Sequence, residues 1–412
     1  MSHAWWTDDD ECLAPGRRRG QGSSGLNAAA TGPEDVAVVA TGSQPLSQVS
    51  ESTRVPGIDR LRVALTAGVI ATHAVITYTA NGSWFYHEGH LPPAVETLAG
   101  IPLALGALFG MGTFFFLAGL FLPASIARHG TGALLRERGL RLGLPAAVFT
   151  LLVVPAVVWW VAVAESRRSS ATAIWQEQLR ELDAGPLWFV WVLLLFTAVA
   201  VPVLGHLRPA TPQPLRLRLL VGCAALVAVT SFVLRIAFRI DSYQLGAAHL
   251  WQWGQCVGLF VLGLIAGRQG WRDAVPAKVR RACVATVTLG VVSIIGMLGF
   301  FADDLDPFGG GFGWQSAVVA VIEGVTSVSA AVLLATLFSD RPLGRTAATL
   351  AGSAYAAYLL QTPILVAVAL ALRPVPAPTT LKLAMLLPTA VILSFVSGAV
   401  LRRIPLLRRV LR

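Results

Sequence analysis

Charged residues are scarce in this chain. They make up 13% of its 412 residues, whereas hydrophobic residues make up 55%; an ordinary soluble domain carries about 25% charged residues. The apolar runs approach the roughly 20 residues that a helix needs to cross a bilayer. This balance excludes a soluble globular protein, and we predict an all-α integral membrane protein, a bundle of about ten transmembrane helices. The predicted spans are residues 58–80, 98–123, 144–164, 186–204, 219–239, 250–267, 282–301, 315–338, 347–371 and 380–401.

The chain has four cysteines and lacks the usual motifs of serine hydrolases and metalloproteins. No Gly-x-Ser-x-Gly sequence offers a nucleophile. His87 and His90 lie three residues apart in a loop, which is weak support for a metal site, and we predict no bound metal. The cysteines have no metal-binding spacing, so we expect those in the spans to pack between helices. They are Cys12, Cys223, Cys256 and Cys283.

The first 55 residues contain no sustained apolar run. They hold acidic and basic clusters and a stretch rich in glycine, serine, alanine and proline, which cannot bury enough surface to fold. No apolar core follows the arginines at 17–19, so we do not expect a signal peptide. We predict a disordered cytoplasmic tail at 1–55, a ten-helix transmembrane domain at 56–404 and a basic cytoplasmic tail at 405–412.

Basic residues are concentrated in alternate links between the predicted spans. The links after the second, fourth, sixth and eighth spans and the C-terminal segment are rich in arginine, and the intervening links are acidic or mixed. Cytoplasmic loops of membrane proteins carry the excess of lysine and arginine. We therefore predict a multi-pass protein of the cytoplasmic membrane with both termini cytoplasmic. This orientation accounts for the net charge of +10, so we expect the lipid bilayer, and no nucleic acid, as a partner.

Arg62 and His73 lie in the first predicted span, eleven residues apart. Eleven residues are about three helical turns, so both side chains lie on one face, about 16 Å apart along the helix axis. The spacing places Arg62 at the cytoplasmic interface and His73 past the middle of the bilayer. Ionisable residues inside a membrane are costly and are candidates for function. Alternatively, Arg62 reaches lipid phosphates and His73 hydrogen-bonds a neighbouring carbonyl.

Other polar or aromatic residues lie in the predicted spans. An unpaired carboxylate at Glu323 would be expensive, so we interpret it either as a site residue or as half of a structural ion pair with a residue such as Arg235. Gln255 and Gln361 either bind substrate or bridge helices. Trp188 either lines an acceptor cleft or belongs to the aromatic belt at the membrane interface.

Several blocks of the sequence resemble the membrane-bound acyltransferase-3 family. The first helix of that family has an Arg-x10-His pattern, as Arg62 and His73 do. A Phe-Phe-x-x-Ser-Gly-Phe segment of the family is similar to residues 113–122, where Ala118 replaces the serine. Further blocks follow in the same order, and the one at 252–263 is similar to the branch that includes glucan-modifying succinyltransferase-like proteins. They are residues 136–145, 186–191, 252–263 and 353–363.

The resemblance implies transfer of a short acyl group from cytoplasmic acyl-CoA, such as acetyl-CoA or succinyl-CoA. The acceptor would be a hydroxyl or amine of a glycan, a lipid-linked sugar or a metabolite. His73 would act as general base, with Glu323 as a second catalytic residue. Guanidinium groups bind phosphates bidentately, and the candidates for CoA binding are Arg62, Arg136, Arg138 and Arg141. The last three are also the charges that any cytoplasmic loop carries for orientation. The candidates for substrate binding are Trp188, Gln255 and Gln361.

Gln361 departs from the family pattern, because histidine is common at its position. His73 would therefore act without a second histidine from that block. The alternative function is a proton-coupled transporter or flippase of a polar metabolite, in which His73 and Glu323 form a proton relay. The sequence has neither an inverted repeat nor paired broken helices, the usual signs of alternating access, so we favour the acyltransferase. The sequence predicts neither the identity of the acceptor nor an oligomeric state.

Overall fold

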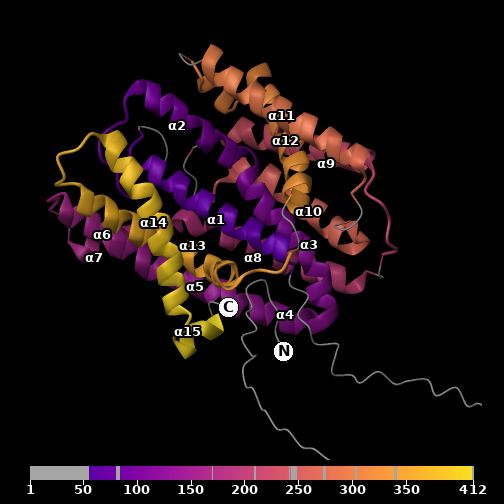
Figure 1. The fold of residues 1–412 in the computed structure, drawn as a ribbon, viewed down its shortest axis with the longest axis horizontal. Coiled ribbons are helices and arrows are strands. Elements are labelled where there is room, and N and C mark those ends of the chain that lie inside the picture. Colours follow the sequence, from indigo (N-terminus) through magenta and orange to yellow (C-terminus); the bar gives the residue numbers. More distant parts are fainter. Residues whose placement is uncertain are drawn as a thin grey trace, which may run out of the picture. The chain divides into compact units, whose positions relative to one another are not determined.

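The computed structural model describes residues 55–79, 84–168, 170–207, 210–240, 242, 248–271, 275–301, 304–337 and 341–410. Of the predicted N-terminal tail only Val55 is among them. Every long element in these residues is a helix (Figure 1). The helices are α1 (Pro56–Ile76), α2 (Pro93–Leu105), α3 (Met111–His129), α4 (Thr131–Arg138), α5 (Leu144–Val148), α6 (Val154–Ala164), α7 (Ala171–Glu181), α8 (Trp188–His206), α9 (Leu217–Ala237), α10 (Trp253–Gln269), α11 (Ala277–Phe300), α12 (Trp314–Leu337), α13 (Arg345–Leu372), α14 (Thr379–Leu401) and α15 (Pro405–Val410).

Nine helical segments of the described residues are long and apolar enough to cross a membrane. They correspond to the second to tenth predicted spans, which confirms an all-helical, multi-pass membrane protein. α1 corresponds to the first predicted span, but it carries Asp59, Arg60 and Arg62 in its first two turns and is therefore less apolar than the others. The count of ten spans and the cytoplasmic placement of both termini remain predictions. The nine segments are Pro93–His129, Thr131–Ala164, Ala171–His206, Leu217–Ala237, Leu250–Gln269, Ala277–Phe300, Trp314–Leu337, Arg345–Leu372 and Thr379–Leu401.

Three π-helical turns lie within the first two long helical segments, Pro93–His129 and Thr131–Ala164. They are η2 (Gly106–Gly110), η3 (Gly139–Gly143) and η4 (Phe149–Val153). A π turn widens the helix locally and leaves a backbone carbonyl outside the regular bonding pattern. The apolar runs do not reveal these turns, because hydropathy does not report the local helix type. η3 carries Arg141 of the cavity described below, and η2 accepts hydrogen bonds from Gln252 and Gln255.

α3 and α10 cross at very close range. A Cβ atom on Gly263 would lie 2.1 Å from the carbonyl oxygen of Phe116, and one on Gly119 would lie 2.3 Å from the carbonyl oxygen of Phe260. Small residues allow membrane helices to approach backbone to backbone. Gly119 and Gly263 therefore pack α3 against α10.

α1 is enclosed by other helices of the bundle (Figure 1). It contacts α13 and α14 along much of its length, and it also contacts α12 and η2. Within α1 only Ala64 and Gly68 are exposed. Arg62 and Thr66 of α1 are therefore buried within the protein, and His73 is partly buried.

Candidate active site

A cavity opens beside Arg62 of α1. It contains about 710 Å³ of space that no protein atom occupies, its open mouth included. Arg138, the last residue of α4, and Arg141 of η3 also line it. The other walls are mostly apolar or aromatic and include Phe114, Phe189, Leu193, Tyr355 and Tyr358. The cavity thus joins a cluster of positive charge to an aromatic interior.

The arginines are held in place by acidic and aromatic neighbours. Arg62 forms an ion pair with Asp59 at 3.1 Å, and its guanidinium lies 5.5 Å from the centroid of the Phe121 ring. Arg141 forms an ion pair with Glu137 at 2.9 Å. These contacts fix the charged groups at the cavity wall, where a polyanionic ligand would meet them already oriented.

Arg136 does not join the other three arginines. It is exposed, whereas Arg138 is only 4% exposed. Residues two apart point to opposite sides of a helix, whereas residues three apart lie on neighbouring parts of one side. Arg138 and Arg141 therefore share the cavity side, and Arg136 faces away from it.

The cavity lies beside the first half of α1, and His73 does not line it. Thr66 lines the cavity on α1, and His73 follows two turns later on the same helix. Tyr358 lines it on α13, and Gln361 follows about one turn later. The Tyr358 hydroxyl donates a hydrogen bond to the carbonyl oxygen of Pro186, which fixes this wall to the start of α8. Each of these two helices thus has a cavity-lining residue followed by a polar residue further along: His73 on α1 and Gln361 on α13.

The orientation of the His73 ring is set by its own helix. Its Nδ1 lies 2.8 Å from the carbonyl oxygen of Val69. A carbonyl only accepts hydrogen bonds, so Nδ1 carries the proton and Nε2 of the neutral ring keeps its lone pair. The ring also stacks on Trp84, with centroids 4.5 Å apart and planes at 28°. The carbonyl contact expected for a purely structural histidine therefore exists, and it leaves Nε2 as the available basic atom.

Gln361 lies beside the His73 imidazole. It is fully buried, and among the described residues neither its amide nitrogen nor its amide oxygen has a hydrogen-bond partner within ordinary distance. Buried polar groups without partners are rare in folded proteins, because each costs free energy. Such an amide next to a basic ring nitrogen suits a group that pairs when a ligand is bound.

A second histidine, His249, was not predicted from the sequence. It lies immediately before the segment Leu250–Gln269, and its ring is 4.9 Å from the Trp188 ring. His249 is near enough to His73 for their charges to interact. Trp188 is 7% exposed and packs in the hydrophobic core, so it does not face the membrane interface, and a role in binding the acceptor stays a prediction. No spacing or periodicity in the sequence marks His249, since it precedes a span instead of lying on a helix face.

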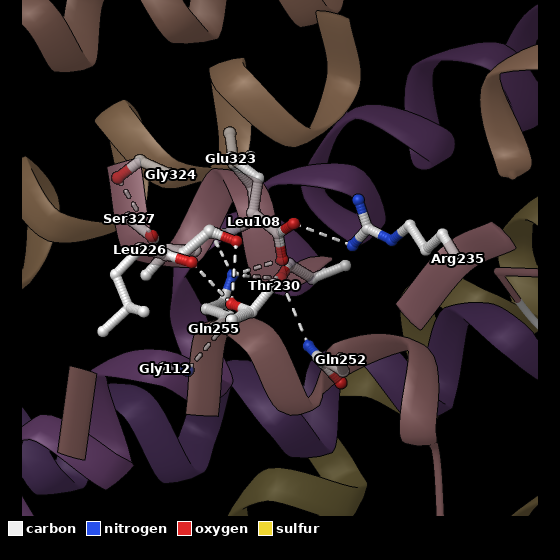
Figure 2. Close-up of polar contacts among 12 residues, drawn as sticks. Leu108, Gly112, Leu226, Thr230, Arg235, Gln252, Gln255, Glu323, Gly324 and Ser327 are labelled. Atoms are coloured by element: carbon white, nitrogen blue, oxygen red, sulfur yellow. Dashed lines mark hydrogen bonds and ion pairs between the residues drawn. The ribbon is translucent and has the colours of Figure 1, made fainter. Parts of the chain in front are cut away.

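Glu323 lies in a separate buried network (Figure 2). Its carboxylate pairs with Arg235 at 2.8 Å and accepts a hydrogen bond from the Gln255 amide at 3.2 Å. Gln255 also donates to the carbonyl oxygen of Leu108 in η2 at 2.6 Å and accepts from the backbone N–H of Gly112 at 2.9 Å. The π turn thus presents a carbonyl that Gln255 satisfies. The contacts of Glu323 and Gln255 are those of the helix-bridging alternatives, because they join α9, α10 and α12 to η2.

Comparison with known proteins identifies the family. The model of the Acyltransferase domain family matches residues 55–400, from the start of α1 almost to the end of α14. The chain belongs to the acyltransferase-3 family. No curated protein and no solved structure matches it significantly. The matched region includes every candidate residue described above. This membrane acyltransferase therefore carries both the cavity and the His73 cluster, which is His73 with Trp84, Gln361 and His249, within its family domain.

An ion pair positions the segment of the acyltransferase that covers His73. Lys382 of α14 pairs with Glu88, and its ammonium group also donates to the carbonyl oxygen of Arg373 at 3.1 Å. Trp84, four residues before Glu88, is thereby held where it stacks on the imidazole.

Among the described residues, no group of three or more His, Cys, Asp or Glu side chains could hold a metal ion.

Proposed function

We propose that the protein transfers a short acyl group from acyl-CoA to a hydroxyl group, with His73 as general base. The observation that carries the proposal is the contact of Nδ1 with the Val69 carbonyl, which leaves Nε2 free to take a proton. The cavity supports it further, because three arginines line it and Thr66, on its wall, lies two turns before His73 on α1.

The arginine end of the cavity is suited to the CoA part of the donor. Acetyl-CoA and succinyl-CoA carry several phosphate charges at one end and the thioester at the end of a long arm. Arg62, Arg138 and Arg141 supply guanidinium groups that bind phosphates bidentately. The aromatic walls then suit the arm, whose thioester would reach the neighbourhood of His73.

The transfer step needs only one base. Nε2 of His73 takes the proton of the acceptor hydroxyl as its oxygen attacks the thioester carbon. The carbon–sulfur bond then breaks, the ester forms, and the protonated imidazole returns its proton to the CoA thiolate. The products are the acylated acceptor and free CoA, and the imidazole is regenerated. An amine acceptor would follow the same sequence and give an amide.

The acceptor side is lined by indole rings. Trp84 and Trp188 lie next to the two histidines, and flat apolar faces beside polar groups suit a sugar ring or a similar polyhydroxy compound. A glycan, a lipid-linked sugar or a hydroxylated metabolite therefore remains our proposed acceptor class. We further propose that the enzyme acts in the cytoplasmic membrane, with the arginine mouth on the cytoplasmic side where acyl-CoA is present.

No observation favours the transporter alternative. It requires His73 and Glu323 to exchange a proton. The carboxylate of Glu323 is instead engaged by Arg235 and Gln255. Both of these contacts occupy the carboxylate, which does not suit a relay to His73.

The function is tested by incubating membranes that contain the full chain with labelled acetyl-CoA or succinyl-CoA and envelope acceptors. We expect label to appear in a glycan, lipid-linked or metabolite fraction and to depend on the protein. Membranes from cells that lack the protein are the control. Absence of protein-dependent label with both donors would contradict the proposal.

The arginines provide a matched pair for testing donor binding. We expect Arg138→Gln to raise the KM for acetyl-CoA by about 10- to 100-fold, the usual cost of losing a charge-assisted hydrogen bond. Arg136→Gln, two residues away on the exposed side, should leave this KM within about twofold. Initial rates at varied acetyl-CoA measure both, and equal effects of the two variants would refute a phosphate role for Arg138. Thermal unfolding of each purified variant shows whether the fold is retained.

A further inference from the structure

His249 adopts a backbone conformation that is unusual for its residue type. Its φ and ψ are 46° and 48°, in the left-handed region. Non-glycine residues are uncommon there, and such strain is retained when the surroundings hold the residue in place, often at functional sites. The backbone N–H of Gln252 donates to the His249 carbonyl at 2.8 Å, and the Trp253 indole donates to the carbonyl of Ala248 at 2.8 Å. The segment is therefore fixed on both sides of the histidine.

Aromatic contacts orient the His249 ring. Its centroid lies 4.9 Å from that of Trp188 and 5.9 Å from that of Trp251. Within the described residues these ring contacts, and not hydrogen bonds to its nitrogens, hold the imidazole. Both ring nitrogens therefore remain available to a ligand, on the side of the site where Trp188 and His73 lie.

Burial keeps this imidazole neutral. The low-dielectric surroundings lower the pKa of His249 from 6.5 to about 4, because burial disfavours the charged form. A group with a lowered pKa is protonated only when the pH falls to that value, so near neutral pH the ring has one N–H donor and one acceptor nitrogen. A sugar hydroxyl both donates and accepts, and it matches this pair of groups.

The buried network of Figure 2 supports the same segment. The Arg235 guanidinium lies 5.8 Å from the centroid of the Trp251 ring, and its other contact is the carboxylate of Glu323 at 2.8 Å. The Gln252 amide donates to the carbonyl oxygen of Ala107 in η2 at 3.2 Å. Arg235 and Ala107 thus contact Trp251 and Gln252, which lie two and three residues after His249. Glu323, which pairs with Arg235, therefore has a positioning role at a distance from the reacting atoms.

We propose that His249 binds the acyl acceptor and orients its hydroxyl group toward Nε2 of His73, an inference that rests on the proposed function. The two imidazoles come from different parts of the chain, one from the last turn of α1 and one from the segment just before α10. His73 moves the proton, and His249 holds the group that gives it up. The acceptor would pack against Trp188 while its hydroxyls pair with the His249 ring.

The test uses His249→Asn, because asparagine tolerates the left-handed backbone better than most residues and lacks the imidazole. Transfer from labelled acetyl-CoA is measured in membranes with increasing amounts of envelope acceptor. We expect the variant to transfer about 10- to 100-fold less at low acceptor, the effect of losing a hydrogen bond to a bound group. The stabilisation of the purified protein by acetyl-CoA, measured as a shift in Tm, should remain as in the wild type.

The matched control is His87→Asn, which changes an exposed histidine in the segment that carries Trp84 and should leave transfer unchanged. Wild-type transfer by His249→Asn at all acceptor amounts would overturn the proposal. Loss of the acetyl-CoA shift in a folded variant would also overturn it, since it would assign His249 to the donor.

A measurement on the wild-type protein covers the case in which the variant does not fold. Diethyl pyrocarbonate modifies available imidazoles, and mass spectrometry follows the reaction at His249. We expect unlabelled envelope extract to slow this modification, and an unchanged rate would overturn the proposal. Protection without any acyl transfer by the wild type would instead refute the proposed function and leave acceptor binding at His249 in place.

Discussion

Replacing His73 with asparagine is expected to lower acyl transfer by about 10²- to 10⁴-fold, the usual contribution of a general base. The asparagine amide nitrogen can still donate to the Val69 carbonyl, which now accepts from Nδ1 at 2.8 Å. What the variant lacks is Nε2, the only basic atom of the ring in its present tautomer. The loss should therefore fall on kcat. The Tm shift caused by acetyl-CoA should be retained, because Arg62, one of the arginines that we propose to bind the phosphates, lies about three turns away on α1.

A second histidine offers a close control for this substitution. His129, near the end of α3, makes the same contact, with its Nδ1 3.1 Å from the carbonyl of Ser125 four residues earlier. His129→Asn removes an equivalent ring from an equivalent backbone contact outside the His73 cluster, so transfer should be unaffected. If His73→Asn transfers label at the wild-type rate, the imidazole is structural and the proposed mechanism is wrong.

Removing the carboxylate of Glu323 is expected to give the largest loss of stability. Glu323 and Arg235 are each 2% exposed, and they pair at 2.8 Å. Glu323→Leu leaves the buried guanidinium without its counter-charge, a change that typically costs about 3–5 kcal/mol of unfolding free energy. Unfolding of the purified protein in mixed micelles measures the loss. We expect transfer to fall with it, because the same guanidinium lies over Trp251 beside His249.

The double variant Glu323→Leu/Arg235→Met separates pairing from packing. Replacing both members of a buried ion pair by apolar residues is often nearly neutral, so the double variant should recover most of the lost stability. An exposed pair gives the scale: Glu165→Ala breaks the contact with Arg167, whose side chain is 54% exposed, and should cost less than about 1 kcal/mol. A single variant as stable as the wild type would show that the Glu323 pair contributes no net stability.

Hydropathy predicted the helices better than their internal form. Apolar runs located the second to tenth spans, because a bilayer requires long stretches of hydrophobic residues. The π turns at 106–110, 139–143 and 149–153 could not be read from the same runs, since a π turn changes the bonding pattern and not the composition. η3 matters for the site, because it carries Arg141 on the cavity wall.

Within the candidate site, the spacing of residues on one helix could be predicted from the sequence, but the contacts between distant segments could not. The eleven-residue offset placed Arg62 and His73 on one side of α1, since it is a property of a single helix. The meeting of Arg62 with Arg138, and of His73 with His249, joins segments far apart in the chain. The pairing of Glu323 with Arg235 was one of two alternatives, and the choice required knowing that α9 packs against α12.

The close crossing of α3 and α10 has a mechanical consequence. The backbones of the two helices meet at Gly119 and Gly263, and Gln255 of α10 donates a hydrogen bond to the Leu108 carbonyl in η2. α3 and α10 therefore form one tightly packed pair. Phe114 of this pair lines the cavity beside Arg62, and His249 lies just before the start of α10. Arg62 and His73 ride on α1, which is attached to α13 and α14. A change in the separation between α1 and this pair of helices would therefore alter the spacing of Arg62 from Phe114 and of His73 from His249 at the same time.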